Sequence, residues 1–403
     1  MATTASLLQW AANQGVVLDG VEPRSISGRG LGMVATRHIN VRDEQLTFAI
    51  NLLTISQDGD VVVTVPTSAI RSRHTLPKAL MAKAATNMTL HGLLAADLLL
   101  HPQSSGVWGK LVPSLADFES STPFFWPKML QELLPREAKN LLRKQQTKFQ
   151  QDWHHAKKVL PDLAEQEYLY SWFLVGTRSF YYEIEETLSY PSHDRLALLP
   201  VADMFNHASA GCSVAFSTEA YEITADRAYQ AGEEVYTSYG THSNDFLLAE
   251  YGFVLPDNPW DQLCLDKVLL AKLPPQHMTA LSERDLLGDF MLRANLAPGD
   301  RTCVAMRGLA SGGGVPEWDD WMHGREDADG TLAEARAMLP GFLAEFRGDV
   351  EDHRRRITEL RDDANAAKMD VLLQRWNQLD ELARAHGRGK QQSRGKDTKN
   401  KIR

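Results

Sequence analysis

The segment Asp203-Met-Phe-Asn-His207 brings side chains with metal-binding and hydrogen-bonding chemistry close together in the sequence. A carboxylate and an imidazole four residues apart are compatible with zinc, but no third ligand lies at a convincing spacing, so a metal site is not favoured. Asn206 and His207 can instead hold a turn through side-chain hydrogen bonds. Taken alone, the segment favours this structural interpretation.

Tyr239 is a second residue whose side chain can do chemistry. Val235, Thr237 and Tyr239 share one face of an expected strand that ends before Gly240. A tyrosine at a strand end usually belongs to the core or to its rim. The functional alternative places the phenol at a narrow aromatic channel, near reacting atoms.

Arg178 follows the aromatic run Tyr168-Leu-Tyr-Ser-Trp-Phe173. One interpretation is a helix that packs its aromatic side chains into a core and leaves the arginine at the surface. The other is an arginine that binds a carboxylate through the planar donors of its guanidinium. Without the other motifs, the first interpretation is favoured.

The run Gly30-Leu-Gly-Met-Val-Ala35 formally matches the dinucleotide-binding pattern. That pattern follows a strand and opens a helix, whereas residues 34–37 have the character of a strand. We therefore reject a nucleotide-binding fold. The run is either a glycine-rich turn between strands or a stretch of backbone that a flat ligand can approach closely.

At 403 residues the chain is long enough for two or three domains, and its 43% hydrophobic and 24% charged residues are typical of a globular protein. The cysteines Cys212, Cys264 and Cys303 are far apart, which excludes a disulfide scaffold and disfavours a cysteine-built zinc site. The sequence shows no apolar run of membrane-spanning length and no secretory signal. We expect a soluble intracellular protein.

The net charge of −9 disfavours nucleic acid as the main ligand. The charge is uneven, because residues 387–403 are rich in lysine and arginine and contain one acid, Asp397. This segment is expected to be disordered, and it suits a nuclear signal, a contact with ribosomal RNA or a solubilising end. The more acidic remainder suits either a basic protein substrate or simple solubility.

Hydrophobic periodicity divides the chain into alternating strand-rich and helical regions. The expected strands lie at residues 33–35, 46–50, 52–55, 61–65, 212–216, 221–225 and 235–239. The expected helices lie at residues 3–14, 90–100, 129–142 and 243–250, the last with Ser243 as its N-cap. Pro135 marks a helix boundary, and Pro340-Gly341 should break any continuous helix beyond residue 256. Two strand-rich pieces separated by so much helix must form either two sheets or one split β-domain.

Several motifs gain meaning from their order along the chain. They are Gly28-Arg-Gly-Leu-Gly-Met-Val-Ala35, Thr177-Arg178, Leu199-Pro-Val-Ala-Asp-Met-Phe-Asn-His207, Gly232-Glu-Glu-Val-Tyr-Thr-Ser-Tyr-Gly240, Ser243-Asn244 and Tyr251-Gly-Phe253. In this order they resemble the SET-domain protein methyltransferases. The long helical insertion and the helical C-terminal part resemble one branch of that family. This branch contains the Rubisco large-subunit and ribosomal-protein lysine methyltransferases, and also an actin histidine methyltransferase.

The resemblance implies an α+β fold, with a SET β-fold built around a pseudoknot core, a large helical insertion and a helical C-terminal domain that binds substrate. The expected parts are an N-terminal helix at residues 1–19, a SET domain at 20–255 split by the insertion at about 70–182, a helical domain at 256–386 and a basic tail at 387–403.

By the same resemblance, the cofactor is S-adenosyl-L-methionine and no metal is required. Tyr239 is implied to be the catalytic residue, and Tyr251 to line the substrate channel. Arg178 is implied to hold the methionine carboxylate, and Phe253 to pack near the adenine. The other implied cofactor-binding residues are Arg29, Gly30 and Leu31 through their backbone, Asn206 and His207 at the amine and the adenine, and Asp203 as the support of their turn.

The function implied by the resemblance is a protein-lysine N-methyltransferase that acts on a non-histone protein, with a ribosomal or translation-related protein as the leading substrate. The alternatives are a protein-histidine N-methyltransferase of the same fold and a catalytically silent SET-fold binding module. The partner is then a protein with a target lysine, the enzyme is a monomer, and its location is the cytoplasm, the nucleus or both.

Overall fold

The computed structural model describes residues 3–40, 59–83, 88–101, 106–294, 298–311 and 331–397. The chain forms two compact units. The first contains residues 1–120 and 143–241, and the second contains residues 121–142 and 242–403. The strands expected at 46–50 and 52–55 lie outside the described residues.

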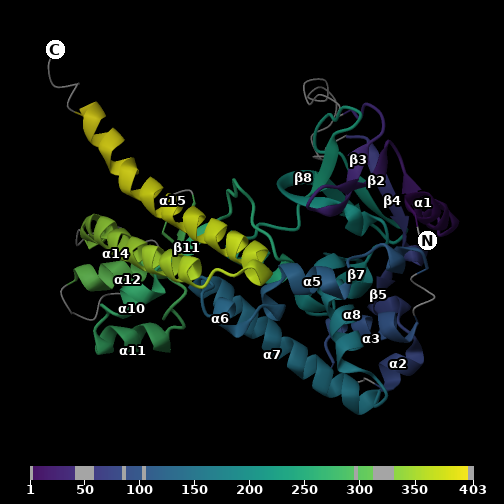
Figure 1. The fold of residues 1–403 in the computed structure, drawn as a ribbon, viewed down its shortest axis with the longest axis horizontal. Coiled ribbons are helices and arrows are strands. Elements are labelled where there is room, and N and C mark those ends of the chain that lie inside the picture. The colour runs from purple at the N-terminus through teal and green to yellow at the C-terminus, as the bar shows by residue number, and fades with distance from the viewer. Residues whose placement is uncertain are drawn as a thin grey trace. The chain divides into compact units, whose positions relative to one another are not determined.

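Among the described residues, the first unit is built on a seven-stranded sheet (Figure 1). Its strands, in spatial order, are β1 (Val17–Leu18), β4 (Val61–Pro66), β9 (Ala220–Thr224), β8 (Asn206–Phe216), β10 (Glu234–Thr237), β3 (Gly30–Ala35) and β2 (Val21–Ile26). Strands from before and after the helical region are neighbours at two places, β4 with β9 and β3 with β10. The strand-rich pieces therefore come together as one split β-domain.

Apolar residues on the sheet explain why it folds. Met33, Val63, Ile223 and Val235 are fully buried and come from four different strands. Burying a side chain of this size contributes about 1.5–3 kcal/mol. The short helix α1 (Thr4–Asn13), expected from the sequence, buries Leu7 and Ala11 and begins with a capping box at Thr3.

In the described sheets, β8 and β10 form the one parallel pair, and their register places Tyr236 opposite Asn206. The register then shifts, so that Thr237 pairs with Cys212. Gly211 permits this close approach, because a Cβ atom there would lie 2.7 Å from the Tyr236 carbonyl oxygen. This pairing brings the start of β8 beside the end of β10.

The helical insertion holds Arg178 at a fixed point. Its helices in the first unit are α2 (Lys78–Lys83), α3 (Leu90–Leu100), α5 (Leu115–Ser121), the larger part of α7 (Arg136–Val159) and α8 (Glu165–Arg178). Helices α3 and α8 pack together, and the Tyr168 hydroxyl donates a hydrogen bond to the Gly92 carbonyl oxygen at 3.1 Å. Arg178 ends α8, and β6 (Ser179–Tyr181) follows directly in a three-stranded sheet with β7 (Leu196–Leu198) and β5 (Arg71–Ser72).

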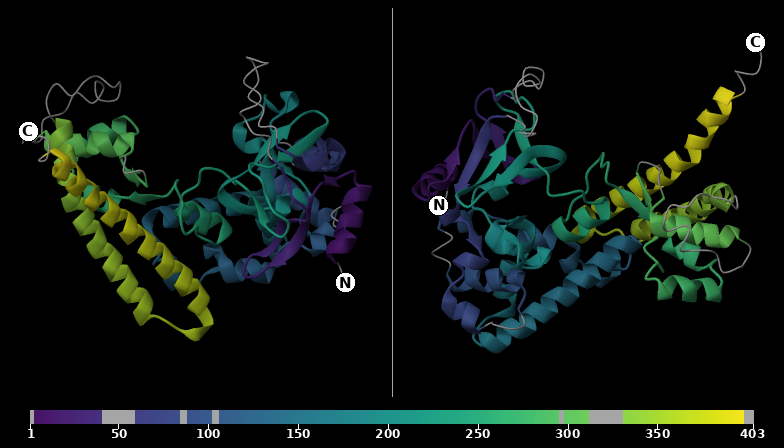
Figure 2. Two further views of the ribbon diagram at one scale, coloured as in Figure 1. Left: turned by 90° about the horizontal axis from the view of Figure 1, so that it is seen from above. Right: turned by 180° about the vertical axis from the view of Figure 1, so that it is seen from behind.

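The second unit is mainly helical and has its own core. Its elements are α6 (Lys128–Gln131), the start of α7, α9 (Asn244–Tyr251), β11 (Gln262–Cys264), α10 (Asp266–Leu270), α11 (Pro275–Glu283), β12 (Met291–Arg293), α12 (Asp300–Ala310), α14 (Thr331–Glu359) and α15 (Ala366–Asp397). Helices α14 and α15 lie side by side as a hairpin (Figure 1 and Figure 2). The short β11–β12 sheet was not expected in a helical domain.

Several local predictions can be compared with these elements. The helix expected at residues 129–142 is divided at Pro135 into α6 and α7, as the proline indicates. The expected break at Pro340 is wrong, because α14 continues through it. Buried Phe342, Leu343 and Phe346 follow the proline on α14, and their packing offsets the cost of the missing hydrogen bond.

The expected disorder of residues 387–403 is wrong for its first part, because α15 extends to Asp397. Adding residues to an existing helix is far easier than nucleating a new one, so a packed helix can continue into a polar segment. Residues 398–403 lie outside the described residues.

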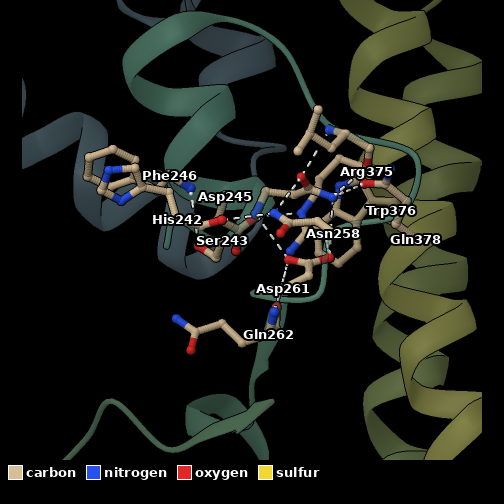
Figure 3. Close-up of polar contacts among 12 residues, drawn as sticks. His242, Ser243, Asp245, Phe246, Asn258, Asp261, Gln262, Arg375, Trp376 and Gln378 are labelled. Carbon is tan, nitrogen blue, oxygen red and sulfur yellow. Dashed lines mark hydrogen bonds and ion pairs between the residues drawn. The ribbon is translucent and has the colours of Figure 1, made fainter. Parts of the chain in front are cut away.

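The predicted domain boundary at residue 255 differs from the boundary between the units, which follows Thr241. A buried network of polar residues explains why α9 belongs with the C-terminal helices (Figure 3). Arg375 of α15 is fully buried and binds Asp245 and Asp261, each at 2.7 Å. Asn244 donates its backbone N–H to Asp261 at 3.1 Å and its side-chain amide to Gln378 at 3.0 Å.

No described helix is long and apolar enough to cross a membrane.

We expect Arg375→Met to destabilise the second unit by about 3–5 kcal/mol, because it leaves two buried carboxylates without their cation. Urea unfolding monitored by the fluorescence of tryptophans, including the neighbouring Trp376, measures the change. Arg361→Met is the matched control: Arg361 forms an exposed ion pair with Asp370 in the same unit, and its loss should lower the stability far less. Equal effects of the two substitutions would show that the buried network does not stabilise this unit.

Candidate active site

Asn206 and His207, whose side chains were expected to hold a turn, lie at the start of β8. The turn precedes them: Ala202–Met204 form a short 3-10 helix that contains Asp203. Asn206 is drawn into the sheet by its pairing with Tyr236 on β10. His207 is buried, whereas Asn206 is partly exposed.

Tyr239, two residues after the end of β10, is fastened to the start of β8 by three contacts. Its hydroxyl donates a hydrogen bond to the Phe205 carbonyl oxygen at 2.8 Å. Its backbone N–H lies 3.0 Å from His207 Nδ1, and the two rings stack with their centroids 4.9 Å apart. Because Nδ1 accepts this bond, the His207 proton is placed on Nε2 of a neutral imidazole.

The Tyr239 phenol is held in its neutral form. Burial raises the pKa of Tyr239 to about 12; Arg178 opposes this rise, while Asp203 and Glu234 add to it. Tyr239 binds Phe205 and His207, which flank Asn206, the partner of Glu234, and follow Asp203, the partner of Arg178, so these residues form one cluster. At neutral pH the phenol is a hydrogen-bond donor, which suits a role in orientation and not in proton abstraction.

Asp203 holds Arg178, and this role was not predicted for it. Arg178 Nη1 donates to the Asp203 side chain at 2.9 Å and to its carbonyl oxygen at 2.8 Å. Trp108 Nε1 lies 2.9 Å from each oxygen of the same carboxylate. Burial raises the pKa of Asp203, and both Arg178 and Trp108 oppose the rise by stabilising the carboxylate.

The opposite edge of the Arg178 guanidinium has no partner among the described residues. Nε is buried and makes no hydrogen bond with the residues that the structure describes, and Nη2 likewise has no partner among them. Nε and Nη2 form the planar pair of donors that binds a carboxylate in bidentate fashion. A buried donor without a partner is costly, so this edge fits an anionic ligand group.

Glu234 joins the cluster although sequence reasoning did not select it. Its Oε1 accepts a hydrogen bond from Asn206 Nδ2 at 2.7 Å. Its Oε2 accepts one from the Tyr236 hydroxyl at 2.8 Å and lies 3.2 Å from Arg29 Nη1. The alternation of residues along β10 could have identified Glu234, because Glu234 and Tyr236 point to the same face of a strand beside Asn206.

Arg29 was expected to contribute through its backbone, but its side chain also takes part. Nη1 lies 3.1 Å from the Tyr236 hydroxyl, a contact that raises the pKa of Arg29, while partial burial lowers it and Glu234 raises it further. Burial raises the pKa of Tyr236 as well. Arg29 thus covers the Glu234 carboxylate from the solvent side, since it is itself exposed.

Two positions in the glycine run, Gly30 and Gly32, require glycine for different structural reasons. Gly30 has a φ of 73° and open space where a Cβ would lie, so it serves the tight turn between β2 and β3. Gly32 is enclosed, because a Cβ there would lie 2.7 Å from both Asn206 Nδ2 and Glu234 Oε1. Leu31 lies on β3 opposite Ser25. The run forms strand β3 and does not open a helix, which agrees with our rejection of a nucleotide-binding fold.

Tyr251 and Phe253 belong to the second unit. Tyr251 ends α9, which is capped by Ser243 at its start and by Gly252 in the left-handed conformation at its end. The Tyr251 and Phe253 rings are 6.1 Å apart. Their expected roles at the channel and the adenine stay predictions.

Two further observations limit what the candidate site can be and where it lies. In the described part of the chain, no group of three or more histidines, cysteines or acids is placed to hold a metal ion. A pocket of about 360 Å³ in the first unit is lined by Trp10, Arg71, His101 and Trp108 among others. Its described lining includes none of the predicted site residues. We therefore place the candidate site by its side-chain geometry and not by this pocket.

Comparison with known proteins supports a methyltransferase resemblance. No family model matches the chain. The ribosomal lysine N-methyltransferase set11 of Schizosaccharomyces pombe is 26% identical over 214 residues, which cover 53% of this chain and 55% of that protein. The actin-histidine N-methyltransferase of Canis lupus familiaris is 24% identical over 271 residues, or 64% of this chain and 44% of that protein. The chain thus spans about half the length of the curated relatives it matches.

A solved structure of Rubisco LSMT bound to sinefungin and monomethyllysine superposes with a TM-score of 0.59. The superposition covers 97% of this chain and 92% of that chain at 16% sequence identity. At this identity the match shows the fold. The predicted α+β SET fold with a helical insertion and a helical C-terminal part is confirmed, and so is the resemblance to SET-domain methyltransferases.

We expect the Tyr239 phenol to remain protonated at about pH 10, where an ordinary tyrosine is half ionised. Carbon-13 NMR of ring-labelled tyrosine measures this, with the Tyr239 signal assigned from its absence in Tyr239→Phe. Free N-acetyl-tyrosinamide in the same buffer is the reference for an accessible phenol. Ionisation of Tyr239 below about pH 9 would make it a candidate base and contradict the orienting role.

Proposed function

We propose that this protein is an S-adenosyl-L-methionine-dependent protein-lysine N-methyltransferase, and that it acts on a non-histone protein. One observation carries the proposal: a neutral, fixed Tyr239 phenol lies in the same cluster as an arginine whose bidentate donor edge is open. This combination provides an anchor for a carboxylate and an orienting group for a reaction. Its occurrence on a SET fold supports methyl transfer as that reaction.

The residues present fit the proposed cofactor. The open edge of Arg178 suits the carboxylate of its methionine part. Asn206 Oδ1 accepts no hydrogen bond from the described residues and suits the ammonium group. Arg29, Gly30 and Leu31 offer backbone groups at the turn into β3. His207 and Phe253 are assigned to the adenine, and Asp203 fixes Arg178 in place.

The cofactor, when bound, supplies a methyl group on a sulfonium, which is transferred by in-line displacement. The accepting amine must be neutral, although free lysine has a pKa near 10.4. An apolar channel disfavours the ammonium form by desolvation. Alignment of the reacting atoms can supply about 7–11 kcal/mol, more than one phenol is able to contribute as a base. We therefore assign Tyr239 to alignment and Tyr251 to the channel wall.

The choice of lysine rests on the relatives. The matched proteins include ribosomal lysine methyltransferases, and one matched solved structure holds monomethyllysine. These favour a lysine of a ribosomal or translation-related protein as the target. Actin-histidine methyltransferases also match, so histidine is the second candidate for the modified residue. A silent binding module is disfavoured by the fixed Tyr239 phenol, since binding alone does not require it.

The proposed partner is a protein substrate, with no membrane and no nucleic acid unless residues 387–403 contact RNA. We propose that the protein acts as a monomer in the cytoplasm, the nucleus or both. The acidic balance of the chain, −9 overall despite its basic end, supports a basic protein as substrate.

Arg178→Met should weaken binding of S-adenosylhomocysteine by about ten- to hundredfold, because a charge-assisted bidentate contact is lost. Isothermal titration measures the affinity. Decarboxylated S-adenosylhomocysteine separates this loss from damage to the fold, since it differs from S-adenosylhomocysteine only in lacking the carboxylate and should be affected far less. Arg227→Met, which removes an exposed arginine of the same unit, should leave both affinities unchanged. Equal losses for the two ligands would contradict the assigned role of Arg178.

Tyr239→Phe should lower turnover by about a hundredfold or more, because the amine and methyl group lose their alignment. S-adenosylhomocysteine affinity should change by less than about threefold, since the ring and its stacking on His207 remain. Transfer of labelled methyl groups to an extract that lacks the enzyme, followed by mass spectrometry of labelled proteins, measures turnover and target. Tyr181→Phe is the control. Full activity of Tyr239→Phe would refute the assignment, and label on histidine would overturn the choice of lysine.

A further inference from the structure

Four side chains from two neighbouring strands and from the turn before β3 converge on one face of the sheet. Glu234 and Tyr236 lie on β10, Asn206 begins β8, and Arg29 precedes β3. Glu234 is the centre of the group, because each of the other three contacts its carboxylate. Its side chain is 10% exposed, so these partners have replaced most of its water.

The two carboxylate oxygens have different partners. Oε1 accepts from Asn206 Nδ2 at 2.7 Å, and Oε2 accepts from the Tyr236 hydroxyl at 2.8 Å beside the Arg29 guanidinium. All of these partners are donors, and a carboxylate satisfies them as an acceptor on both oxygens. An amide of the same shape presents one acceptor and one donor, so it cannot satisfy both sides.

Glu234 thereby determines which way the Asn206 amide faces. With Nδ2 bound to Oε1, the other end of the amide is an acceptor, Oδ1, which accepts no hydrogen bond from the residues that the structure describes. The space around this contact is closed by Gly32, where a Cβ would lie 2.7 Å from both atoms of the bond. The amide therefore has a fixed position as well as a fixed orientation.

We propose that Glu234 is a positioning residue that holds the Asn206 amide with its oxygen available to the ammonium group of the cofactor. This inference rests on the proposed function, because it names the part of the cofactor that depends on Glu234. Glu234 acts through Asn206. Tyr236 and Arg29 keep the carboxylate in place, the one by a hydrogen bond and the other by charge.

Glu234→Gln tests this directly. The glutamine amide can keep its oxygen on Asn206 Nδ2 only by turning its NH2 group toward the donors of Tyr236 and Arg29. The Arg29 cation favours the opposite placement, in which the glutamine presents its NH2 group to Asn206. Asn206 must then reverse, and a reversed Asn206 presents donors to an ammonium group. We expect affinity for S-adenosylhomocysteine, which has the ammonium, to fall about tenfold or more. Affinity for 5′-deoxy-5′-methylthioadenosine, which lacks the amino-acid part, should change by less than about twofold. Isothermal titration measures both.

Two variants complete the experiment. Glu233→Gln changes the neighbouring, exposed glutamate, which pairs with Arg227, and should leave both affinities unchanged. Asn206→Asp combined with Glu234→Gln exchanges the carboxylate and the amide between the two positions. The exchange restores a donor–acceptor pair and a free oxygen, so it should recover most of the lost affinity for S-adenosylhomocysteine. Asn206→Asp alone sets two carboxylates against each other and should bind poorly.

A second measurement does not depend on the cofactor. The Asn206 side-chain N–H signals of the ligand-free protein should exchange slowly with water and should lose this protection in Glu234→Gln. Equal loss of both ligands, no loss of either, or no recovery in the exchanged pair would overturn the positioning role. If the unaltered protein binds neither ligand, the proposed function fails, and the exchange measurement alone decides whether Glu234 orients Asn206.

Discussion

The parallel pairing of β8 with β10 is the constraint on which the candidate site depends. Parallel neighbours cannot be joined by a tight turn, so the chain must leave β8, form β9 and return before β10 begins. The pairing sets the amide of Asn206 beside Glu234 and lets the segment after β10 reach back to His207 and Phe205. Tyr239 receives its position from these contacts, since it lies beyond the last paired residue of β10. A residue outside regular structure is therefore fixed as firmly as one within it.

Arg375, which is fully buried, and Arg178, which is partly buried, show how the same type of side chain serves structure and function. Arg375 donates to Asp245, to Asp261 and to the Gln262 carbonyl oxygen, so each of its three nitrogens has an acceptor within the protein. Arg178 has one carboxylate partner and an open edge. Burial makes an unmet donor expensive, and the cost is removed when a ligand supplies the acceptor. Arg375 has acceptors for all of its nitrogens and Arg178 does not. This difference in hydrogen bonding identifies Arg178 as a ligand-binding residue.

Sequence periodicity predicted much of the fold because it reports local preferences. The strands around Val63 and Val235 and the helix capped by Ser243 were predicted from alternation and capping. The failures came from interactions between distant segments. Asn206 and His207 have the composition of a turn but begin β8, where Asn206 is paired with β10. Pro340 has the signal of a break but lies in a helix held by packing. The continuation of α15 to Asp397 likewise depends on the packed helix before it.

The candidate residues could be chosen from motif order, but their roles could not. Asp203 was expected to support a turn, whereas its carboxylate holds Arg178 and Trp108. Glu234 was missed because a glutamate at a strand start is usually solvated, and only the neighbouring strand reveals its partner. Gly32 limits how the sequence can change over time. A side chain at residue 32 needs the space that Asn206 and Glu234 occupy, so substitutions at these positions depend on one another. A variant with a larger residue 32 must first have made room at Asn206, at Glu234 and at Ile26, which a Cβ atom there would also meet. The order in which such substitutions accumulate is therefore restricted.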